Sequence, residues 1–198
     1  WFGFNAGSAL SSGVVAVSAF VVTHAAAASG GLIWALLEWK LNGKPTVFGT
    51  ITGVIAGLAT ITPASGFVTP LAGLLIGAVA GLICYLFVAF VKNKLRYDDS
   101  LDAFGVHGVG GILGTLAAGL FATTLVNSGG ANGLFYGGTG LFGIQLFAVV
   151  AVALYTFVVT FLIYKVVDLF MGVRVAEKEE EIGLDLTEHR EAAYTVLE

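Results

Sequence analysis

Long apolar runs separated by short polar segments constrain the fold of this chain more than any other feature. Hydrophobic residues make up 57% of its 198 residues and charged residues 11%, and the mean hydropathy is +0.93. A soluble domain carries about a quarter charged residues, and roughly 20 consecutive apolar residues allow a helix to cross a bilayer. The sequence therefore predicts an all-α, polytopic membrane helical bundle with spans at about 9–38, 47–62, 70–91, 100–124 and 141–171.

The two ends of the chain lie outside these five spans. Residues 1–8 begin with Trp1, and neither a capping residue nor a signal peptide precedes it. We therefore expect the chain to begin inside a helix, at the end of another membrane span, and to be the C-terminal part of a longer protein. Residues 173–198 are rich in charged side chains and are expected to form a tail outside the membrane.

The nine Lys and Arg residues fall in three segments of the chain. Two lie between the first two spans, three between the third and the fourth, and four from Lys165 to Arg190. Five crossings place these three segments on one side of the membrane, and the positive-inside rule makes that side cytoplasmic. The sequence thus predicts a multi-pass protein of the cell membrane, with its N-terminal end outside and its tail in the cytoplasm.

Small residues recur in three of the spans at the spacing that brings helices together. In lipid, close approach of two backbones holds helices in contact, and small side chains permit that approach. The recurrence in three spans favours helix packing over the chance abundance of glycine in membrane helices. The residues are Gly53 and Gly57, then Gly73, Gly77 and Gly81, and then Gly110, Gly114 and Ala118.

The fourth span carries a histidine in an otherwise apolar segment. We expect Asp99 to cap this helix and Asp102 to lie in its first turn, because free N–H groups there favour acidic side chains. With a start near Ser100, His107 lies roughly 10–12 Å along a helix that crosses a core about 30 Å thick. An ionisable side chain at that depth favours a role in the wall of a polar pathway over a purely structural hydrogen bond.

Other positions admit both a structural and a functional interpretation. His24 follows Thr23 in an ordinary span without a glycine cluster, and we favour a structural role for it. The aromatic residues Trp1 and Phe4 with Ser8 suit either an aromatic belt at the membrane surface or a site for a small cation. Residue types alone favour neither of these two interpretations.

The sequence lacks the motifs of several enzyme classes. It contains no glycine-rich phosphate loop, no HExxH motif and no nucleophile elbow, and its single cysteine, Cys84, lies in an apolar run. A lone thiol forms neither a disulfide framework nor a metal-binding pair. We therefore expect no enzymatic activity, no cofactor, no metal site and no nucleic-acid partner.

Four motifs occur in order along nearly the whole chain. They are WFGFNAGS at 1–8, TPASG at 62–66, DAFGVHGVGG at 102–111, and GLD at 183–185 followed by His189, Glu191, Ala193 and Tyr194. Together they closely resemble the ammonium transporter family (Amt/Mep/Rh). The resemblance implies eleven spans, the first ten forming two inverted five-helix repeats, and a homotrimer with one pore per subunit. It also implies that this chain holds the end of span six and spans seven to eleven.

The resemblance implies roles for five residues. Ser8 resembles the hydroxyl of the outer ammonium-recruitment site, Phe4 one of two stacked gating phenylalanines, and Trp1 a tryptophan that lines the pore beneath them. His107 resembles one of two paired pore histidines, and Thr62 lies in a motif close to the pore. By this resemblance, ammonium gives up its proton and passes as neutral ammonia, which avoids placing a bare cation in a dry pore.

Three functions remain open at this point. The favoured one is transport of ammonium or ammonia through a histidine-lined hydrophobic pore. The second is an ammonium sensor or receptor that signals through its cytoplasmic tail, and the third, which the Trp-Phe-Ser cluster disfavours, is a channel for a neutral solute. Apolar residues in the charged tail, Leu184, Leu186, Ala193 and Tyr194, suggest that it docks on the cytoplasmic ends of the spans. The resemblance supports this docking and implies that the tail contacts a neighbouring subunit and lies near a site for a PII-type signalling protein.

Overall fold

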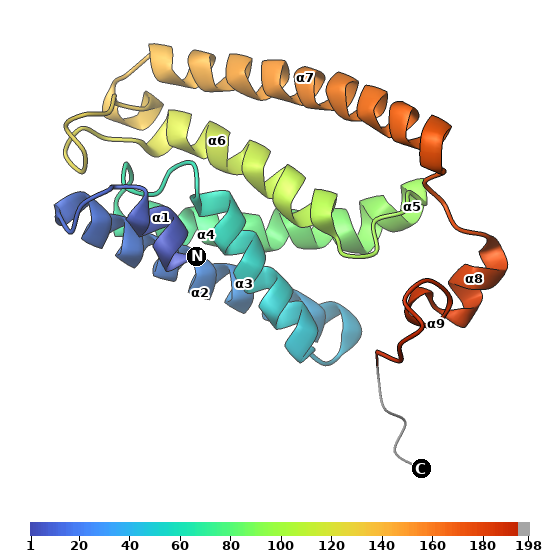
Figure 1. Cartoon of the computed structure of the whole chain (residues 1–198). Coiled ribbons are helices and arrows are strands. Elements are labelled where there is room, and N and C mark those ends of the chain that lie inside the picture. Colours follow the sequence, from blue (N-terminus) through green and yellow to red (C-terminus); the bar gives the residue numbers. More distant parts are fainter. Residues whose placement is uncertain (194–198) are drawn as a thin grey trace. The chain divides into compact units, whose positions relative to one another are not determined.

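The computed structural model describes residues 1–193, and the regular secondary structure of this part of the chain is helical throughout (Figure 1). This confirms the all-α expectation. The elements are α1 (Phe2–Gly7), α2 (Val14–Asn42), α3 (Val47–Ile61), α4 (Pro70–Leu86), the π-helical η1 (Phe87–Lys92), α5 (Asn93–Leu95), the π-helical η2 (Phe104–Gly108), α6 (Val109–Phe121), the 3₁₀ turn η3 (Leu134–Tyr136), α7 (Gly140–Met171), α8 (Glu177–Ile182) and α9 (Leu184–Thr187).

The chain divides into two compact units, Trp1–Val150 and Ala151–Glu198. The first unit contains the elements from α1 to η3 together with the beginning of α7. The second contains the rest of α7 and the two short helices α8 and α9. All the residues expected to line a pore belong to the first unit.

Four helical stretches in the described part of the chain are long and apolar enough to cross a membrane. The helix α3 has only 15 residues, which at 1.5 Å per residue amounts to about 22 Å, less than the hydrocarbon core of about 30 Å. Its crossing therefore stays a prediction. The four candidate spans are Val14–Asn42, Pro70–Leu95, Phe104–Phe121 and Gly140–Met171.

Glycines allow α2 to lie directly against both α3 and α4, as Figure 1 shows for the three ribbons. A Cβ added at Gly57 of α3 or at Gly77 of α4 would overlap the carbonyl oxygen of Ala26 on α2. Likewise, a Cβ at Gly114 of α6 would overlap the carbonyl oxygen of Thr60 on α3. The prediction that small residues bring these helices together is confirmed.

Hydroxyl side chains explain where α3 and α4 begin. The hydroxyl of Thr46 accepts a hydrogen bond from the backbone N–H of Gly49 at 2.8 Å. Thr69 caps α4 in the same way, and Pro70 occupies the first turn, where its missing N–H leaves no bond unmade.

Glu38 is buried beside the start of α3, although the sequence suggested only the polar end of a span. One carboxylate oxygen accepts a hydrogen bond from the backbone N–H of Thr46 at 2.7 Å, and the other accepts one from the indole N–H of Trp34 at 3.4 Å. The side chain is 8% exposed. A buried carboxylate is costly unless hydrogen-bonded, and the free N–H groups at a helix start supply favourable donors. Glu38 thereby joins the end of α2 to the beginning of α3.

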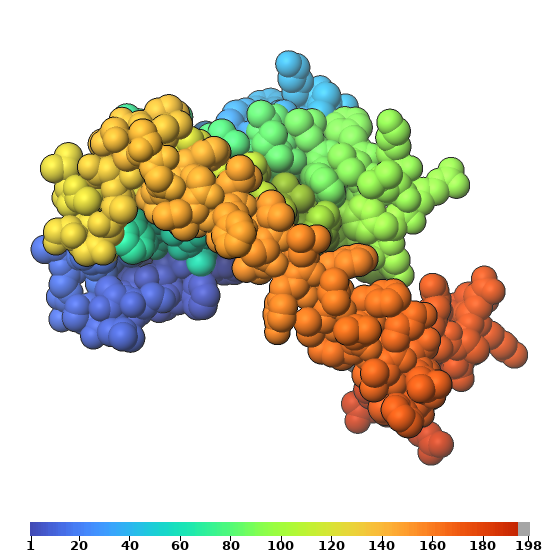
Figure 2. Space-filling view, turned by 90° about the horizontal axis from the view of Figure 1, so that it is seen from above, coloured from blue at the N-terminus to red at the C-terminus, as the bar shows by residue number. Residues whose placement is uncertain are grey.

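The segment after α6 folds back onto the end of that helix. The backbone N–H of Gly133 donates to the carbonyl of Ala122 at 2.7 Å, and the rings of Phe121 and Phe135 lie 5.0 Å apart. In Figure 2 this segment, coloured yellow, packs with the first turns of α7 at one end of the first unit. These bonds satisfy backbone groups in a connection that contains little regular structure.

The tail in the second unit is held by charged side chains. The guanidinium of Arg174 donates two hydrogen bonds to the carboxylate of Glu180, at 2.9 and 3.0 Å, and lowers the pKa of that carboxyl. The backbone N–H of Ala193 donates to the carboxylate of Asp185 at 2.9 Å and is the main cause of the lowered pKa of Asp185. The tail therefore has a folded structure of its own and is not simply a solvated acidic run.

Two apolar side chains of the tail are left half-exposed. Leu184 and Leu186 are 45% and 49% exposed. Tyr194, which is also expected to take part in docking, lies outside the described residues. Docking of the tail on the membrane spans stays a prediction.

We expect Gly57→Ala to destabilise the protein by about 1–3 kcal/mol, because the added methyl group overpacks the contact with Ala26. Thermal unfolding of the purified protein in detergent measures the change. Gly143→Ala on α7 is the matched control, because a Cβ there meets no atom within 4 Å. Equal melting temperatures for the two variants would contradict the proposed backbone contact.

Candidate functional site

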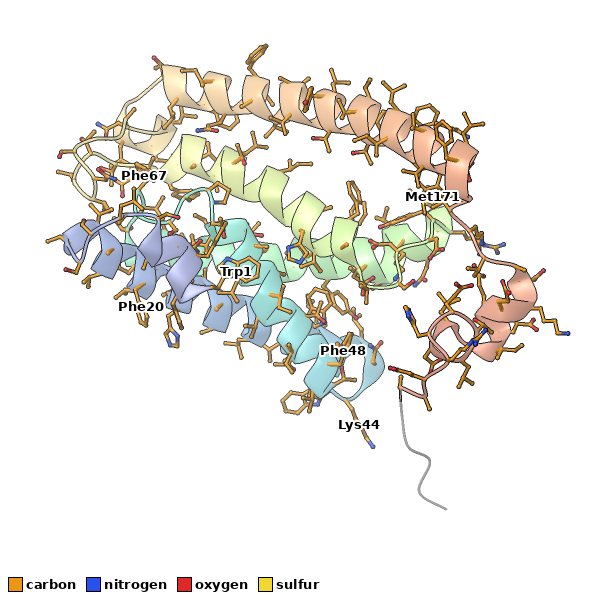
Figure 3. All side chains as sticks on the ribbon, in the orientation of Figure 1. Trp1, Phe20, Lys44, Phe48, Phe67 and Met171 are labelled. Atoms are coloured by element: carbon orange, nitrogen blue, oxygen red, sulfur yellow. The ribbon has the colours of Figure 1, made fainter. Side chains whose placement is uncertain are left out.

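Trp1 is the centre of a cluster that brings together residues from three separate parts of the sequence. Its indole N–H donates to the hydroxyl of Thr62, just after α3, at 2.8 Å. Its ring is stacked on the imidazole of His107, with centroids 6.0 Å apart and planes inclined by 13°. The ring of Phe4 meets it edge-on at 6.4 Å. Figure 3 labels Trp1 beside α3.

The aromatic cluster lies on an uncovered face of the first unit. Phe4 is 64% exposed and Trp1 is 44% exposed, and His107 is exposed as well. The structure thus gathers four of the five residues expected near a pore, namely Trp1, Phe4, Thr62 and His107. It shows their contacts with one another, and their contact with a substrate stays a prediction.

Ser8, the fifth expected residue, uses its hydroxyl hydrogen within its own helix. The hydroxyl donates to the backbone carbonyl of Phe4 at 2.6 Å. A hydroxyl has one donor and two acceptor positions, so this bond orients the oxygen lone pairs of Ser8 away from Phe4 and leaves them available to an N–H donor.

His107 lies in the π-helical segment η2. Single π-helical turns inside longer helices are uncommon and occur often at functional sites. The preceding residue, Val106, is 2% exposed and belongs to a core cluster with Trp34 and Tyr85. The backbone at His107 is therefore held by the core, while the imidazole itself points to the uncovered face.

The carboxylate of Asp99 collects the free N–H groups at the start of the His107 span. It accepts hydrogen bonds from the backbone of Ala103 at 2.8 Å, of Phe104 at 3.0 Å and of Gly105 at 3.4 Å. These donors have no partner within the helix itself, and a carboxylate also suits the positive end of the helix dipole. Ala103 is the N-cap of η2, which begins at Phe104, so the expected start near Ser100 is wrong.

Asp102 does not lie in the first turn of this helix, as the sequence suggested. It precedes the helix in a left-handed conformation with φ of 54°, and its carboxylate pairs with the ammonium of Lys92 at 2.6 Å. The expected start was wrong because Asp99 bonds across the intervening turn and not to the residues directly after it. Lys92 was interpreted only as a marker of the cytoplasmic side, since its partner cannot be read from residue type.

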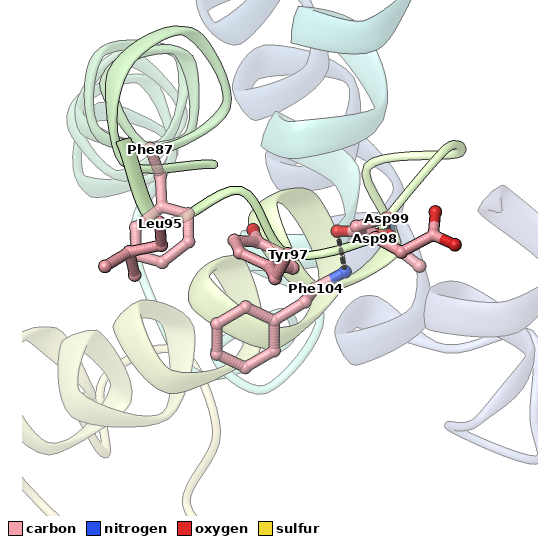
Figure 4. Close-up of a pocket in the computed structure, with 7 residues that line it drawn as sticks. Phe87, Leu95, Tyr97, Asp98, Asp99 and Phe104 are labelled. Atoms are coloured by element: carbon pink, nitrogen blue, oxygen red, sulfur yellow. Dashed lines mark hydrogen bonds between the residues drawn. The ribbon is translucent and has the colours of Figure 1, made fainter. Parts of the chain in front are cut away.

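A hollow lies beside the carboxylate of Asp99, between the first residues of η1 and η2 and the segment that joins them. In Figure 4 the ring of Phe104 lies beside that of Tyr97, with centroids 6.3 Å apart, and a dashed line marks the bond from the backbone N–H of Phe104 to Asp99. The hydroxyl of Tyr97 is buried without a hydrogen-bond partner; burial and, to a lesser extent, the nearby Asp99 raise the pKa of Tyr97. The lining residues are Phe87, Leu95, Tyr97, Asp98, Asp99, Ala103 and Phe104.

Residues on the other side of α1 form a second, separate contact. Phe2 stacks on Phe20 with centroids 4.1 Å apart, and its ring lies 6.2 Å from that of His24, which is exposed on α2. The buried amide of Asn5 donates to Thr23 at 3.0 Å. His24 thus does not join the Trp1 cluster. Within residues 1–193, no group of three or more His, Cys, Asp or Glu side chains is placed to hold a metal ion.

The sequence matches the family described as Ammonium Transporter Family over residues 1–194. The chain belongs to the ammonium transporter family. The ammonium transporter of Bacillus subtilis (strain 168) is 54% identical over 194 residues, a match that covers 98% of this chain and 48% of that protein. The chain therefore spans about half the length of the curated relatives it matches.

Solved structures of ammonium transporters have a similar fold. Mep2 of Saccharomyces cerevisiae superposes with a TM-score of 0.85 at 34% identity, over 90% of this chain and 41% of that one. A structure described as a Sensor Amt Protein superposes with a TM-score of 0.83 at 30% identity, over 95% of this chain and 45% of that one. The resemblance seen in the sequence is confirmed. The chain is a multi-pass membrane protein of a family of transporters, not of enzymes.

We expect Asp99→Ala to lower the stability of the protein by about 1–2 kcal/mol, because several helix N–H groups lose their acceptor. Thermal unfolding in detergent measures the loss. Asp98→Ala is the control, since Asp98 is exposed and its bond to the Ser100 hydroxyl is long, at 3.5 Å. An equal loss of stability in Asp99→Ala and Asp98→Ala would contradict the specific role of Asp99 as acceptor for the helix N–H groups.

Proposed function

We propose that this chain forms part of the pore of a transporter for ammonium or ammonia. The observation that carries the proposal is the stack of Trp1 on His107, with Thr62 and Phe4 around it, in a member of the ammonium transporter family. A bare cation in a dry membrane interior is costly, so such a pore must replace its hydration or remove its charge. Aromatic faces, a hydroxyl oxygen and an imidazole supply groups for both tasks.

Residues of α1 and the residues on either side of it would receive the cation. The faces of Trp1 and Phe4 attract a small cation, and the oxygen of Ser8 accepts one of its N–H groups in place of a water molecule. The bond from Ser8 to the Phe4 carbonyl supports this role, because it turns the hydroxyl hydrogen away from an approaching cation. This bond supports the cation site over the aromatic belt.

His107 would line the path along which ammonia moves after ammonium has lost its proton. A neutral imidazole offers one hydrogen-bond donor and one acceptor, so it can orient ammonia or accept a proton. Its stack on Trp1 restricts the ring to one plane. This restriction supports a defined path along the ring.

The assembly of the whole protein follows from the same family membership. We propose that this chain supplies spans seven to eleven of an eleven-span fold with inverted repeats, that the first repeat carries the second pore histidine, and that the protein is a homotrimer in the cell membrane. The distribution of the basic residues supports a cytoplasmic tail and an N-terminal end outside the cell.

The alternative function is an ammonium sensor whose tail transmits the signal. A likeness to a structure described as a Sensor Amt Protein favours keeping it. The tail has internal structure and two half-exposed leucines, Leu184 and Leu186. Docking of this tail on the spans or on a neighbouring subunit, with a PII-type protein binding nearby, would serve regulation of a transporter as well as signalling.

In the full-length transporter, we expect His107→Ala to lower selective uptake of methylammonium about tenfold or more, because the pore loses a hydrogen-bonding wall. His24→Ala is the matched control, since it removes an exposed imidazole that lies outside the Trp1 cluster. Uptake into liposomes is compared at equal amounts of reconstituted protein. Equal losses in the two variants would contradict the assignment of His107 to the pore.

We expect deletion of residues 183–198 from the full-length transporter to lower uptake about two- to tenfold without preventing membrane insertion or trimer formation, since docking shifts a conformational equilibrium by modest free energies. Liposome flux measures the uptake, and the mass of the purified complex shows whether the trimer forms. Ammonium binding without flux in the intact protein would favour the sensor. Unchanged flux and unchanged PII binding after the deletion would make the segment a passive tail.

A further inference from the structure

We propose that Lys92 is a positioning residue for the pore histidine His107 and that it acts through Asp102. The inference rests on the proposed role of His107 in the pore. It assigns Lys92, a residue without contact to that pore, a part in orienting the imidazole. The observations that carry it are an ion pair, a backbone conformation and two π-helical segments that meet at this place.

The ion pair connects the end of one π-helical segment to the start of the other. Lys92 is the last residue of η1, and Asp102 directly precedes the helix that contains η2. Their charged groups lie 2.6 Å apart, and the side chains are only 24% and 16% exposed. Since the pair is largely removed from water, its Coulomb attraction is screened less than that of a surface ion pair, and the loss of one partner leaves a poorly solvated charge.

Asp102 has a backbone conformation that requires support from its surroundings. Its φ of 54° is left-handed, which costs free energy in a residue with a Cβ. In this conformation its carbonyl accepts the hydrogen bond from the N–H of Val106 at 2.9 Å, the first backbone bond of the turn that leads to His107. The pull of Lys92 on the carboxylate therefore favours the conformation from which this turn begins.

The direction of the His107 ring depends on this turn. The recorded ring contact of His107 is the stack on Trp1, and the side chain is otherwise exposed. A π-helical turn contains one more residue than an α-helical turn, so its relaxation to α-helix would rotate the following residues about the helix axis. Such a rotation would take the imidazole off the face of Trp1. Asp99 and the ion pair of Lys92 together oppose it.

The competing explanation is that the ion pair only stabilises the fold. The position of the His107 ring separates this explanation from a positioning role of Lys92. The full-length transporter is prepared with Lys92→Met, Lys92→Arg and the control Lys94→Met. Lys94 lies on the short helix α5 and is exposed, so its variant removes the same charge from the same end of the span. Electron cryomicroscopy in lipid nanodiscs gives the geometry of the His107 and Trp1 rings, and liposome uptake gives the flux.

In Lys92→Met we expect the imidazole to leave the parallel stack and uptake to fall about fivefold. Lys92→Arg, which keeps the charge, should retain the parallel stack and normal uptake. Lys94→Met should likewise leave the stack and the uptake unchanged. An unmoved His107 ring in Lys92→Met overturns the inference, whether or not uptake falls. If Lys92→Met fails to assemble, Asp102→Asn, which keeps the shape of the side chain, takes its place with the same expected result.

The test separates this inference from the proposed transport function. Absence of uptake by the unmodified protein would contradict transport, while the ring geometry would still decide the role of Lys92. Normal uptake by the unmodified protein together with a His107 ring that stays stacked in Lys92→Met and in Asp102→Asn would contradict the positioning role alone.

Discussion

The rest of the first unit depends on the close backbone contact of α2 with α3 and α4 at Ala26. Gly57 and Gly77 both face the carbonyl group of this residue, and neither leaves space for a side chain. Between helices in lipid there is no hydrophobic driving force, so such contacts provide much of the association energy. Ala26 thus limits how closely both α3 and α4 approach α2, together with Gly30, whose carbonyl oxygen faces Gly53 and Gly81.

The position of α3 in turn determines the position of the candidate site. Because α3 lies against α2, Thr60 near its end meets Gly110 and Gly114 of α6, which brings the His107 span to the same end. Thr62 then lies within hydrogen-bond distance of Trp1, and His107 within stacking distance. The site is built from helix ends and turns, yet its geometry follows from glycine contacts within the helices.

The proposed transport and the alternative sensing function place similar demands on the candidate pore residues and different demands on the tail. Recognition of a small cation needs the aromatic faces and the hydroxyl oxygen in either case. Regulation needs a tail that can take up more than one arrangement. The ion pair of Arg174 with Glu180 and the closure of Asp185 on Ala193 organise the tail by itself. A self-contained tail can be docked or released as one piece, which suits both functions.

The sequence by itself determined the helical membrane class, the family, and four residues of the cluster around Trp1, because apolar length and local motifs are properties of contiguous residues. Tertiary structure decided that Lys92 pairs with Asp102 and that the buried carboxylate of Glu38 bonds the start of α3. The helix bounds were only partly predictable: α3 matches the expected 47–62 to within one residue, whereas the helical stretch of the span expected at 100–124 is Phe104–Phe121. Partner choice for a charged side chain depends on which helix end folds beside it, and this is decided by packing between segments distant in the sequence.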